Sequence, residues 1–479
     1  MQLKAALAEI SGLRYMVDKL DIKSGLAHRV LMASPFITNQ EKLSFVFQQI
    51  EQTINAIQDD EGKKILNKVS IKFSQLRDIA GTIKHIQKRV TLNDIELFEI
   101  KSFALMADEI RDMLRPMEFL SHLIPDLQAV ISLLDPEGSR VPSFYISSHF
   151  APGLGDLRKK LAGIEFSIED ALVNNDGQLL NQLQKQSDDL RGQITEIEDD
   201  VRQKLTEALF GFTDDLNIAL HELANIDILF AKAKQSIQFQ LILPDICADF
   251  TSYKGLFYPQ LKDLLDSQVR RYQPLDVDVY QGSCIITGAN MAGKTVLLKT
   301  LALSQALCQF GFFIPALDAK IVLVDQILFS IADEQSELSG LSSFAAEMLK
   351  VDNIVKQAKK QNRLLILIDE LARTTNPAEG RAIVNAVANI LNGCMALSVI
   401  TTHYSGLISP CRKLRVKGFI EQSESTSITV QNIGDFIDYS LIEDDGSDAP
   451  HEALRIAQIL GVDNGLISEA SKYMLKKIE

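Results

Sequence analysis

One eight-residue stretch, Gly288–Thr295, limits what this chain can fold into more than any other part of its sequence. It reads GANMAGKT, follows the apolar run Ser283–Thr287, and precedes Val296–Leu307, which has the composition of a buried helix. The spacing G-x-x-x-x-G-K-T is that of the phosphate-binding P-loop. Glycines let the backbone N–H groups of such a loop face inward, and the following helix directs its positive end at the anion. The sequence therefore predicts a nucleotide-binding loop between a strand and a helix.

The side chains of this loop have distinct predicted roles. We expect Lys294 to reach the β- and γ-phosphates of a triphosphate and the Thr295 hydroxyl to hold Mg²⁺. ATP and Mg²⁺ are thus the predicted ligands. The predicted nucleotide-binding residues are the loop and the first turn of its helix: Gly288, Ala289, Asn290, Met291, Ala292, Gly293, Lys294, Thr295 and Val296.

A pair of carboxylates follows a second apolar run. Leu364–Ile368 is continuously apolar, as is typical of a strand buried on both faces, and it ends in Asp369 and Glu370. The first carboxylate at such a strand end can hold Mg²⁺ directly or through water. The second can orient or deprotonate an attacking water. Thr295 and Asp369 are therefore the predicted metal residues, and Glu370 is the predicted base.

Two further groups point to phosphate chemistry. His403 follows the strand candidate Ala396–Thr401, at the end of a parallel strand where ligands bind, and a neutral imidazole there can hydrogen-bond the γ-phosphate or the lytic water. The serines of Ser339–Phe344 precede a helix that begins near Ala345. Such serines are N-caps by default, and they also bind anions. In the second role their phosphate belongs to a neighbouring subunit, because the P-loop already surrounds its own nucleotide.

The rest of the chain divides by its periodicity. Residues 1 to about 240 are poor in proline and carry apolar seams at helical spacing, the first running from Leu43 to Ile57 and the second from Leu190 to Leu205. From about residue 241, short apolar strands alternate with helices, which indicates an α/β domain. The fold class is therefore α plus α/β. The strand candidates are Ser283–Thr287, Ile321–Leu323, Leu364–Ile368, Ala396–Thr401 and Ser427–Val430.

Charge and cysteine usage limit the partners and the compartment. The net charge is −14, whereas a protein whose main partner is DNA usually shows a basic surface. Ile164–Glu207 has 11 Asp/Glu against 4 Lys/Arg, a local net charge of −7. The five cysteines form no C-x-x-C pair, Met1–Lys23 is charged throughout, and the uncharged Thr300–Leu317 contains Pro315 and several polar residues. We predict a cytoplasmic protein with reduced thiols, no signal peptide and no membrane span.

Four motifs resemble the ATPase domain of the MutS family. They are Gly288–Thr295, Gly340–Met348 (GLSSFAAEM), Ile368–Thr375 (IDELARTT) and Thr401–Tyr404 (TTHY). Phe313-Ile314-Pro315-Ala316 also matches the pattern of that family. Ser24–Leu31 resembles the start of the helical core of the family, and Leu223–Leu229 resembles its return to the ATPase. The resemblance covers nearly the whole chain and is strongest from about 250 to 475.

The resemblance implies an ABC-type ATPase that works as a homodimer with two composite sites. Its implied catalytic residues are Glu370, His403, Lys294 and, acting on the partner's nucleotide, Ser342. An aromatic residue before the sheet would stack on adenine, and the candidates are Tyr272 and Phe257. The implied domains are a helical core and lever (1–130), a second helical block with an acidic, clamp-like arm (131–240), and the P-loop ATPase with a C-terminal helical dimerisation segment (241–479).

The chain also departs from the pattern of mismatch-repair members. It has Ala292-Gly293-Lys294-Thr295 where they usually have Gly-Gly-Lys-Ser. By the resemblance, we expect it to begin at the helical core, without mismatch-reading and connector domains. Its Phe-x-Glu triplet, Phe419–Glu421, falls inside the ATPase. Two functions therefore stay open. The first is a DNA-associated, MutS-like ATPase that does not read mismatches itself. The second is an ATP-driven protein remodeller, such as a reactivating factor for a cobalamin-dependent aminomutase.

Overall fold

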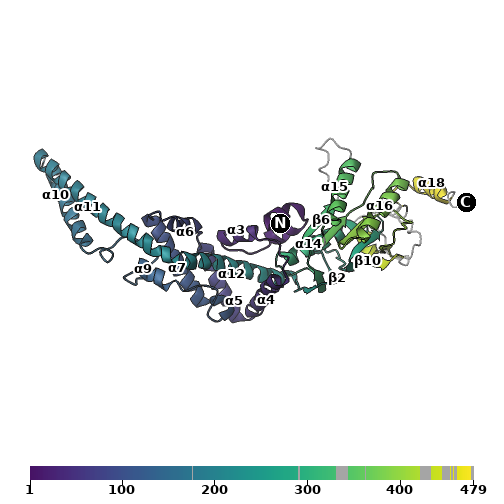
Figure 1. The fold of residues 1–479 in the computed structure, drawn as a ribbon, viewed down its shortest axis with the longest axis horizontal. Helices are drawn as coiled ribbons and strands as arrows, with labels where there is room; N and C mark the ends of the chain where they lie inside the picture. The colour runs from purple at the N-terminus through teal and green to yellow at the C-terminus, as the bar shows by residue number, and fades with distance from the viewer. Residues whose placement is uncertain are drawn as a thin grey trace. The chain divides into compact units, whose positions relative to one another are not determined.

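The structure is a computed structural model and describes residues 1–174, 176–289, 292–330, 343–361, 363–420, 433–444, 454, 457 and 461–475. The chain forms two compact units (Figure 1). The helical unit comprises Asp21–Met32 and Gln52–Ala231. The sheet unit comprises Met1–Leu20, Ala33–Glu51 and Lys232–Glu479. These units are a division by contacts, and the sequence-predicted domain boundaries near 130 and 240 stay predictions.

The helical unit is built from amphipathic helices with identifiable start signals. Asp59 caps α5, accepting from Gly62 N at 2.7 Å, and Asn93 and Glu96 form a reciprocal capping box at the start of α7. The unit contains most of α3 (Gly25–Ala33), parts of α4 (Gln40–Ala56) and α12 (Thr213–Phe239), and α5 (Asp60–Gln75), α6 (Ala80–Gln87), α7 (Asp94–Met113), α8 (Glu118–Ser121), α9 (Gln128–Leu134), α10 (Leu154–Val173) and α11 (Gly177–Leu209).

Helices α10 and α11 pack side by side as a helical hairpin, which we call the arm (Figure 1). The apolar seam from Leu190 to Leu205 lies on α11, where Ile194, Val201 and Leu205 are buried. A short 3₁₀ turn, η1 (Phe210–Phe212), joins α11 to α12. The prediction that this seam packs helix against helix is therefore confirmed.

The sheet unit contains a six-stranded sheet with the order β10-β9-β4-β8-β7-β6. All neighbours in it are parallel except β10, which pairs antiparallel with β9. Its strands are β4 (Gly282–Thr287), β6 (Gln326–Ser330), β7 (Leu364–Ile368), β8 (Leu397–Thr402), β9 (Arg412–Phe419) and β10 (Ile437–Glu443). The predicted class, long helices followed by a P-loop α/β domain, is confirmed.

A second sheet has the order β1-β5-β2-β3, formed by β1 (Asp245–Cys247), β2 (Phe250–Leu256), β3 (Leu275–Tyr280) and β5 (Asp318–Val322). The sheet unit also holds α1 (Leu3–Glu9), α2 (Leu13–Asp18), α13 (Pro259–Ser267), α14 (Lys294–Gln309), α15 (Ser343–Ala358), α16 (Pro377–Asn392), η3 (Ile433–Phe436) and α18 (Asn464–Leu475). The described helix α18 lies in the C-terminal segment that the sequence predicts to be helical.

The strands that the sequence identifies are those buried on both faces. Every residue of β4, β7 and β8 is buried, and β7 has the predicted bounds. Strand β5 lies slightly before the predicted Ile321–Leu323. The strands β1, β2, β3, β6, β9 and β10 are missed, because most of them mix polar and apolar residues, as in the LDVDVY of β3. The candidate Ser427–Val430 lies outside the described residues.

Within the described part of the chain, no helix is long and apolar enough to cross a membrane. The first ten residues of the uncharged stretch, 300–309, form the buried second half of α14. This agrees with the prediction of a buried helix there.

Candidate nucleotide site

The P-loop lies between β4 and α14, at the edge of the sheet where β4, β7 and β8 end. Gly293 is the N-cap of α14 and has φ of +73°, a left-handed conformation that L side chains rarely adopt. A Cβ atom at this position would also lie 3.0 Å from Cδ1 of Tyr439 on β10. The second glycine of the motif is therefore required by both backbone conformation and packing.

Lys294 folds back over the start of the loop. Its Nζ donates to the carbonyl oxygens of Gly288 at 2.6 Å and Ala289 at 2.8 Å, and the side chain is buried. Burial lowers the pKa of Lys294, while the charges of Glu370 and Asp369 oppose that shift. The cation therefore lies at the mouth of the loop within electrostatic reach of both carboxylates. The predicted residues Asn290 and Met291 lie outside the described part of the chain.

Asp369 joins the acidic pair to the P-loop helix. Its Oδ2 accepts from the Thr295 hydroxyl at 2.6 Å, and its Oδ1 accepts from the Thr401 hydroxyl at 2.5 Å. Asp369 itself is buried at the end of β7. The sequence-predicted metal residues Thr295 and Asp369 are thus brought into direct contact.

A hydroxyl and a carboxylate oxygen at this spacing suit Mg²⁺, which prefers oxygen ligands. Among the described residues, no group of three or more His, Cys, Asp or Glu side chains could hold a metal ion. A magnesium ion bound by Thr295 and Asp369 would therefore complete its shell with phosphate oxygens and water, as Mg²⁺ in nucleotide sites usually does.

Glu370 directly follows Asp369 and has a different set of contacts. Its backbone N–H donates to the Thr401 hydroxyl at 3.0 Å, and its Oε2 accepts from Nη1 of Arg373 at 2.7 Å. Its φ of +46° lies in the left-handed region. The carboxylate that the sequence predicts to be the base is therefore paired with a cation.

His403 follows β8, and its ring lies 4.2 Å from the Tyr404 ring between centroids. Partial burial and the charges of Lys294 and Arg373 lower the pKa of His403, while the charge of Glu370 opposes this. The imidazole is therefore favoured in its neutral form. Lys294, Glu370 and His403, which lie far apart in the sequence, interact electrostatically in one place.

The residues that form this site lie in a part of the chain that matches a known protein family. Residues 284–479 match MutS domain V. The chain carries a MutS domain V. This confirms the resemblance that the four motifs predict, and because domain V is an ATPase domain, it assigns ATP binding to the sheet unit.

The relatives found by sequence comparison are named endonuclease MutS2. The protein of Caldicellulosiruptor saccharolyticus is 28% identical over 386 residues, which are 77% of this chain and 46% of that protein. Those of Caldanaerobacter subterraneus and Agathobacter rectalis are 30% and 36% identical over 256 and 190 residues. These matches cover 53% and 39% of this chain, and 30% and 23% of the two relatives. The chain thus spans less than half the length of the relatives it matches.

The aromatic candidates for adenine stacking in domain V have defined surroundings. The Tyr272 hydroxyl accepts from the backbone N–H of Tyr258 at 2.9 Å, and Phe257 is buried with Nζ of Lys262 at 5.0 Å from its ring centroid. The next residue, Gln273, donates to Asp438 on β10 at 2.9 Å. The role of Tyr272 and Phe257 stays a prediction.

Several residues near the site were missed by the sequence analysis. Tyr439 borders Gly293, Arg373 pairs with Glu370, and Thr401 bonds both Asp369 and Glu370. Thr401 ends a predicted strand and Arg373 lies in a quoted motif, so both had a signal in the sequence. Tyr439 had none, because β10 follows the site by many residues and pairs at the far edge of the sheet. Ser342 lies outside the described residues.

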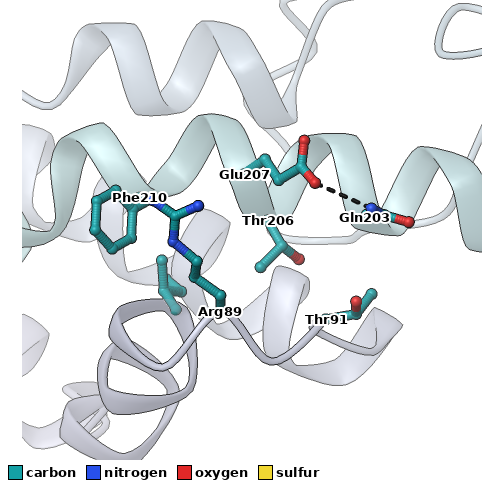
Figure 2. A pocket seen from close by; sticks show the side chains of 7 residues that line it. Arg89, Thr91, Gln203, Thr206, Glu207 and Phe210 are labelled. Atoms are coloured by element: carbon teal, nitrogen blue, oxygen red, sulfur yellow. Dashed lines mark hydrogen bonds between the residues drawn. The ribbon is translucent and has the colours of Figure 1, made fainter.

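A surface pocket of about 220 Å³ lies in the helical unit, between the end of α6 and the end of α11 (Figure 2). The Arg89 guanidinium lies over the Phe210 ring at 4.8 Å, and Gln203 donates to Glu207 at 3.0 Å. The lining residues are Ile86, Arg89, Thr91, Gln203, Thr206, Glu207 and Phe210. The pocket shares no residue with the nucleotide site.

Proposed function

We propose that this protein hydrolyses ATP as a homodimer with two composite active sites. The observation that supports this most directly is the contact between the Thr295 hydroxyl and Asp369 at 2.6 Å, which joins the P-loop helix to the acidic strand end. Glu370, His403 and Lys294 interact electrostatically at the same place. Proteins of the MutS family typically dimerise.

Each residue has a role in this proposal. Lys294 exchanges the carbonyl oxygens of Gly288 and Ala289 for the β- and γ-phosphates of ATP. Thr295 and Asp369 would hold Mg²⁺, which neutralises phosphate charge when bound. Glu370 leaves Arg373, orients the attacking water and accepts its proton.

His403 serves the same step as a neutral imidazole that hydrogen-bonds the γ-phosphate or the water. Its lowered pKa suits this role, because the neutral ring can both donate and accept at physiological pH. Ser342 would contact the γ-phosphate bound by the partner subunit.

An ATPase assay with two variants tests the proposal. Lys294→Ala removes the cation that binds the phosphates, so we expect ATP binding to be lost. Glu370→Ala leaves the phosphate contacts in place, so we expect ATP to bind normally and to be hydrolysed about 10²-fold or more slowly. A Glu370→Ala variant that turns over at the normal rate would show that another group activates the water.

The proposed partner is DNA, because the relatives that match most of this chain are named endonucleases. Binding to the phosphate backbone should weaken steeply with salt, since each phosphate contact releases counterions. Titration of labelled duplex DNA from about 50 to 200 mM salt, with and without ATP, measures this. A flat salt dependence would contradict a backbone-binding role.

The arm favours a second candidate, an ATP-driven remodeller of a partner protein such as a cobalamin-dependent aminomutase. The arm is acidic, with a net charge of −7 over Ile164–Glu207. Large apolar side chains are exposed near the turn between its helices: Phe166 at 68%, Leu172 at 55% and Val173 at 80%. Acidic and apolar surface suits a protein better than a phosphate backbone. Absence of DNA binding at low salt, together with recovery of an aminomutase in a pull-down, would favour this candidate.

A further inference from the structure

The backbone after Glu370 is held in an unusual conformation. Glu370 has φ of +46° and Ala372 has φ of +62°, and neither residue is a glycine. Residues other than glycine are strained in this conformation, and they persist in it only when the surrounding structure holds them. Contacts around Leu371–Arg373 must therefore fix this turn.

Two side chains form hydrogen bonds with the backbone of Ala372. Its backbone N–H donates to Oε1 of Glu347 at 2.8 Å, and its carbonyl oxygen accepts from the Tyr404 hydroxyl at 2.8 Å. Glu347 lies on α15 and Tyr404 follows β8, so the two contacts come from different elements. Ala372 itself is completely buried.

Tyr404 has little freedom to move. It is buried, and a Cβ atom on Gly380 of α16 would lie 2.2 Å from its hydroxyl oxygen, so only glycine fits opposite it. The hydroxyl is therefore a fixed donor.

Glu347 differs from an ordinary surface carboxylate. It is half-buried, and among the described residues it forms no ion pair within 4.0 Å. Burial raises its pKa, while the Ala372 N–H and the charge of Arg373 oppose this. In the described part of the chain, the Glu347 carboxylate thus accepts from the Ala372 amide and has no paired cation.

From this geometry we propose that Glu347 is the positioning residue for Glu370. Its Oε1 holds the Ala372 amide, this contact fixes the left-handed turn, and the turn sets where the Glu370 carboxylate points. This inference rests on the proposed ATPase function, in which Glu370 activates water. Glu347 does not touch the nucleotide in this role and acts only through the turn.

The hydrogen bond between Glu347 and Ala372 also involves the helix that follows Ser342. Helix α15 begins at Ser343, directly after Ser342, the residue proposed to contact the partner's γ-phosphate. Glu347 lies about one helical turn further along α15. The hydrogen bond to Ala372 thus joins the helix that would sense the partner's nucleotide to the turn that positions Glu370.

Variants at Glu347 distinguish its proposed role in positioning Glu370 from an effect of its charge and from an effect on the stability of the fold. Glu347→Gln keeps a side-chain oxygen that can accept from Ala372 N, whereas Glu347→Ala removes it. Asp352→Ala is the matched control, because Asp352 is an exposed carboxylate on the same helix and pairs with Lys356.

We expect Glu347→Ala to lower kcat by about 10- to 100-fold, the size of effect that a misplaced catalytic group produces. Glu347→Gln should retain most of kcat, and all three variants should bind ATP with wild-type affinity.

Hydrogen exchange provides a readout that does not depend on catalysis. The amide of Ala372 should exchange faster in Glu347→Ala than in the wild type, Glu347→Gln or Asp352→Ala. If the wild type does not hydrolyse ATP, the proposed function fails, while the exchange result still reports whether Glu347 holds the turn.

Four results would overturn the inference. The first is a normal kcat in Glu347→Ala, and the second is unchanged exchange at Ala372 in that variant. The third is a parallel loss of kcat, ATP affinity and thermal stability in Glu347→Ala, because this would assign Glu347 to folding alone. A Glu347→Gln variant as slow as Glu347→Ala would likewise overturn it, since the acceptor oxygen would then be irrelevant.

Discussion

Thr401 connects both acidic residues of the nucleotide site. Its hydroxyl donates to Asp369 at 2.5 Å and accepts from the Glu370 backbone N–H at 3.0 Å, and the residue is fully buried. A buried hydroxyl used as both donor and acceptor fixes the two residues relative to each other. It also leaves the other oxygen of Asp369 for Thr295.

Replacing this hydroxyl tests its role. Thr401→Val keeps the shape but leaves Asp369 Oδ1 and the Glu370 amide without a buried partner, so we expect a loss of about 1–3 kcal/mol in the free energy of unfolding. Magnesium-dependent ATP binding should weaken as well, because Asp369 is then less constrained. Urea denaturation and ATP titration measure the two effects. Thr401→Ser, which retains the hydroxyl, is the control, and equal stability of the Val and Ser variants would contradict the assignment.

His403 leads to a pH prediction. Partial burial, Lys294 and Arg373 lower its pKa below the ordinary value of 6.5, so the ring is neutral at and above neutral pH. If the neutral ring is the working form, the hydrolysis rate should stay level through neutral pH and fall only below pH 6.5. His403→Gln should lack that fall. A rate that rises as the pH falls below 6.5, with no such rise in His403→Gln, would show that the charged ring is the working form.

At the scale of elements, helix α14 follows the P-loop at its N-terminal end and has a buried lysine just beyond its C-terminal end. Just beyond its C-terminal end, Lys232 of α12 donates to the carbonyl oxygens of Phe310 at 3.0 Å and Gly311 at 2.8 Å. Nζ of Lys232 lies 4.1 Å from the Phe312 ring centroid. A neutral amine has two N–H donors, which matches these two acceptors.

The protonation of Lys232 makes the free energy of unfolding depend on pH. Burial lowers its pKa from 10.5 to about 7. Between these values the folded chain holds a neutral amine, whereas the unfolded chain holds a protonated one, so unfolding takes up a proton. The contribution of Lys232 to the free energy of unfolding therefore rises with pH in this window, by up to about 1.4 kcal/mol per pH unit.

Urea denaturation at pH 7, 8 and 9 checks this prediction. The difference in unfolding free energy between wild type and Lys232→Met should grow with pH. Lys232→Arg, which cannot become neutral, should be less stable than wild type throughout. A difference that does not change with pH would mean that Lys232 has the same protonation state in both the folded and the unfolded chain.

At the scale of the whole molecule, the composite-site proposal makes a prediction about mixed dimers. Ser342→Ala and Lys294→Ala should each be nearly inactive. A mixed dimer has one site in which both the P-loop lysine and the partner's serine are intact. Mixing equal amounts should therefore restore about a quarter of the wild-type rate, since half of the dimers are mixed and each has one working site of two.

The rate of the mixture, measured against each variant alone, decides between shared and separate sites. Normal hydrolysis by Ser342→Ala alone would contradict the composite site. A mixture no more active than the average of its components would do the same. The dimer itself can be followed by sedimentation with and without ATP.

The sequence by itself predicted the parts of the candidate nucleotide site, because these parts are local. The glycine spacing of the P-loop, the apolar run of β7 and the acidic pair are each set within a few neighbouring residues. Backbone geometry then brings them together, since the carboxyl ends of neighbouring parallel strands meet at one edge of the sheet. The helical seams are predictable for the same reason, because the spacing of their apolar residues along the sequence fixes the buried face of each helix.

The tertiary structure alone decided which side chains support the site. Tyr439 lies beside Gly293 because β10 pairs with β9, and Glu347 meets Ala372 because α15 packs near the end of β7. The left-handed turn at Ala372 and the buried amine of Lys232 are equally invisible in the sequence. Each depends on contacts between segments that are distant along the chain, and a local pattern contains no information about such contacts.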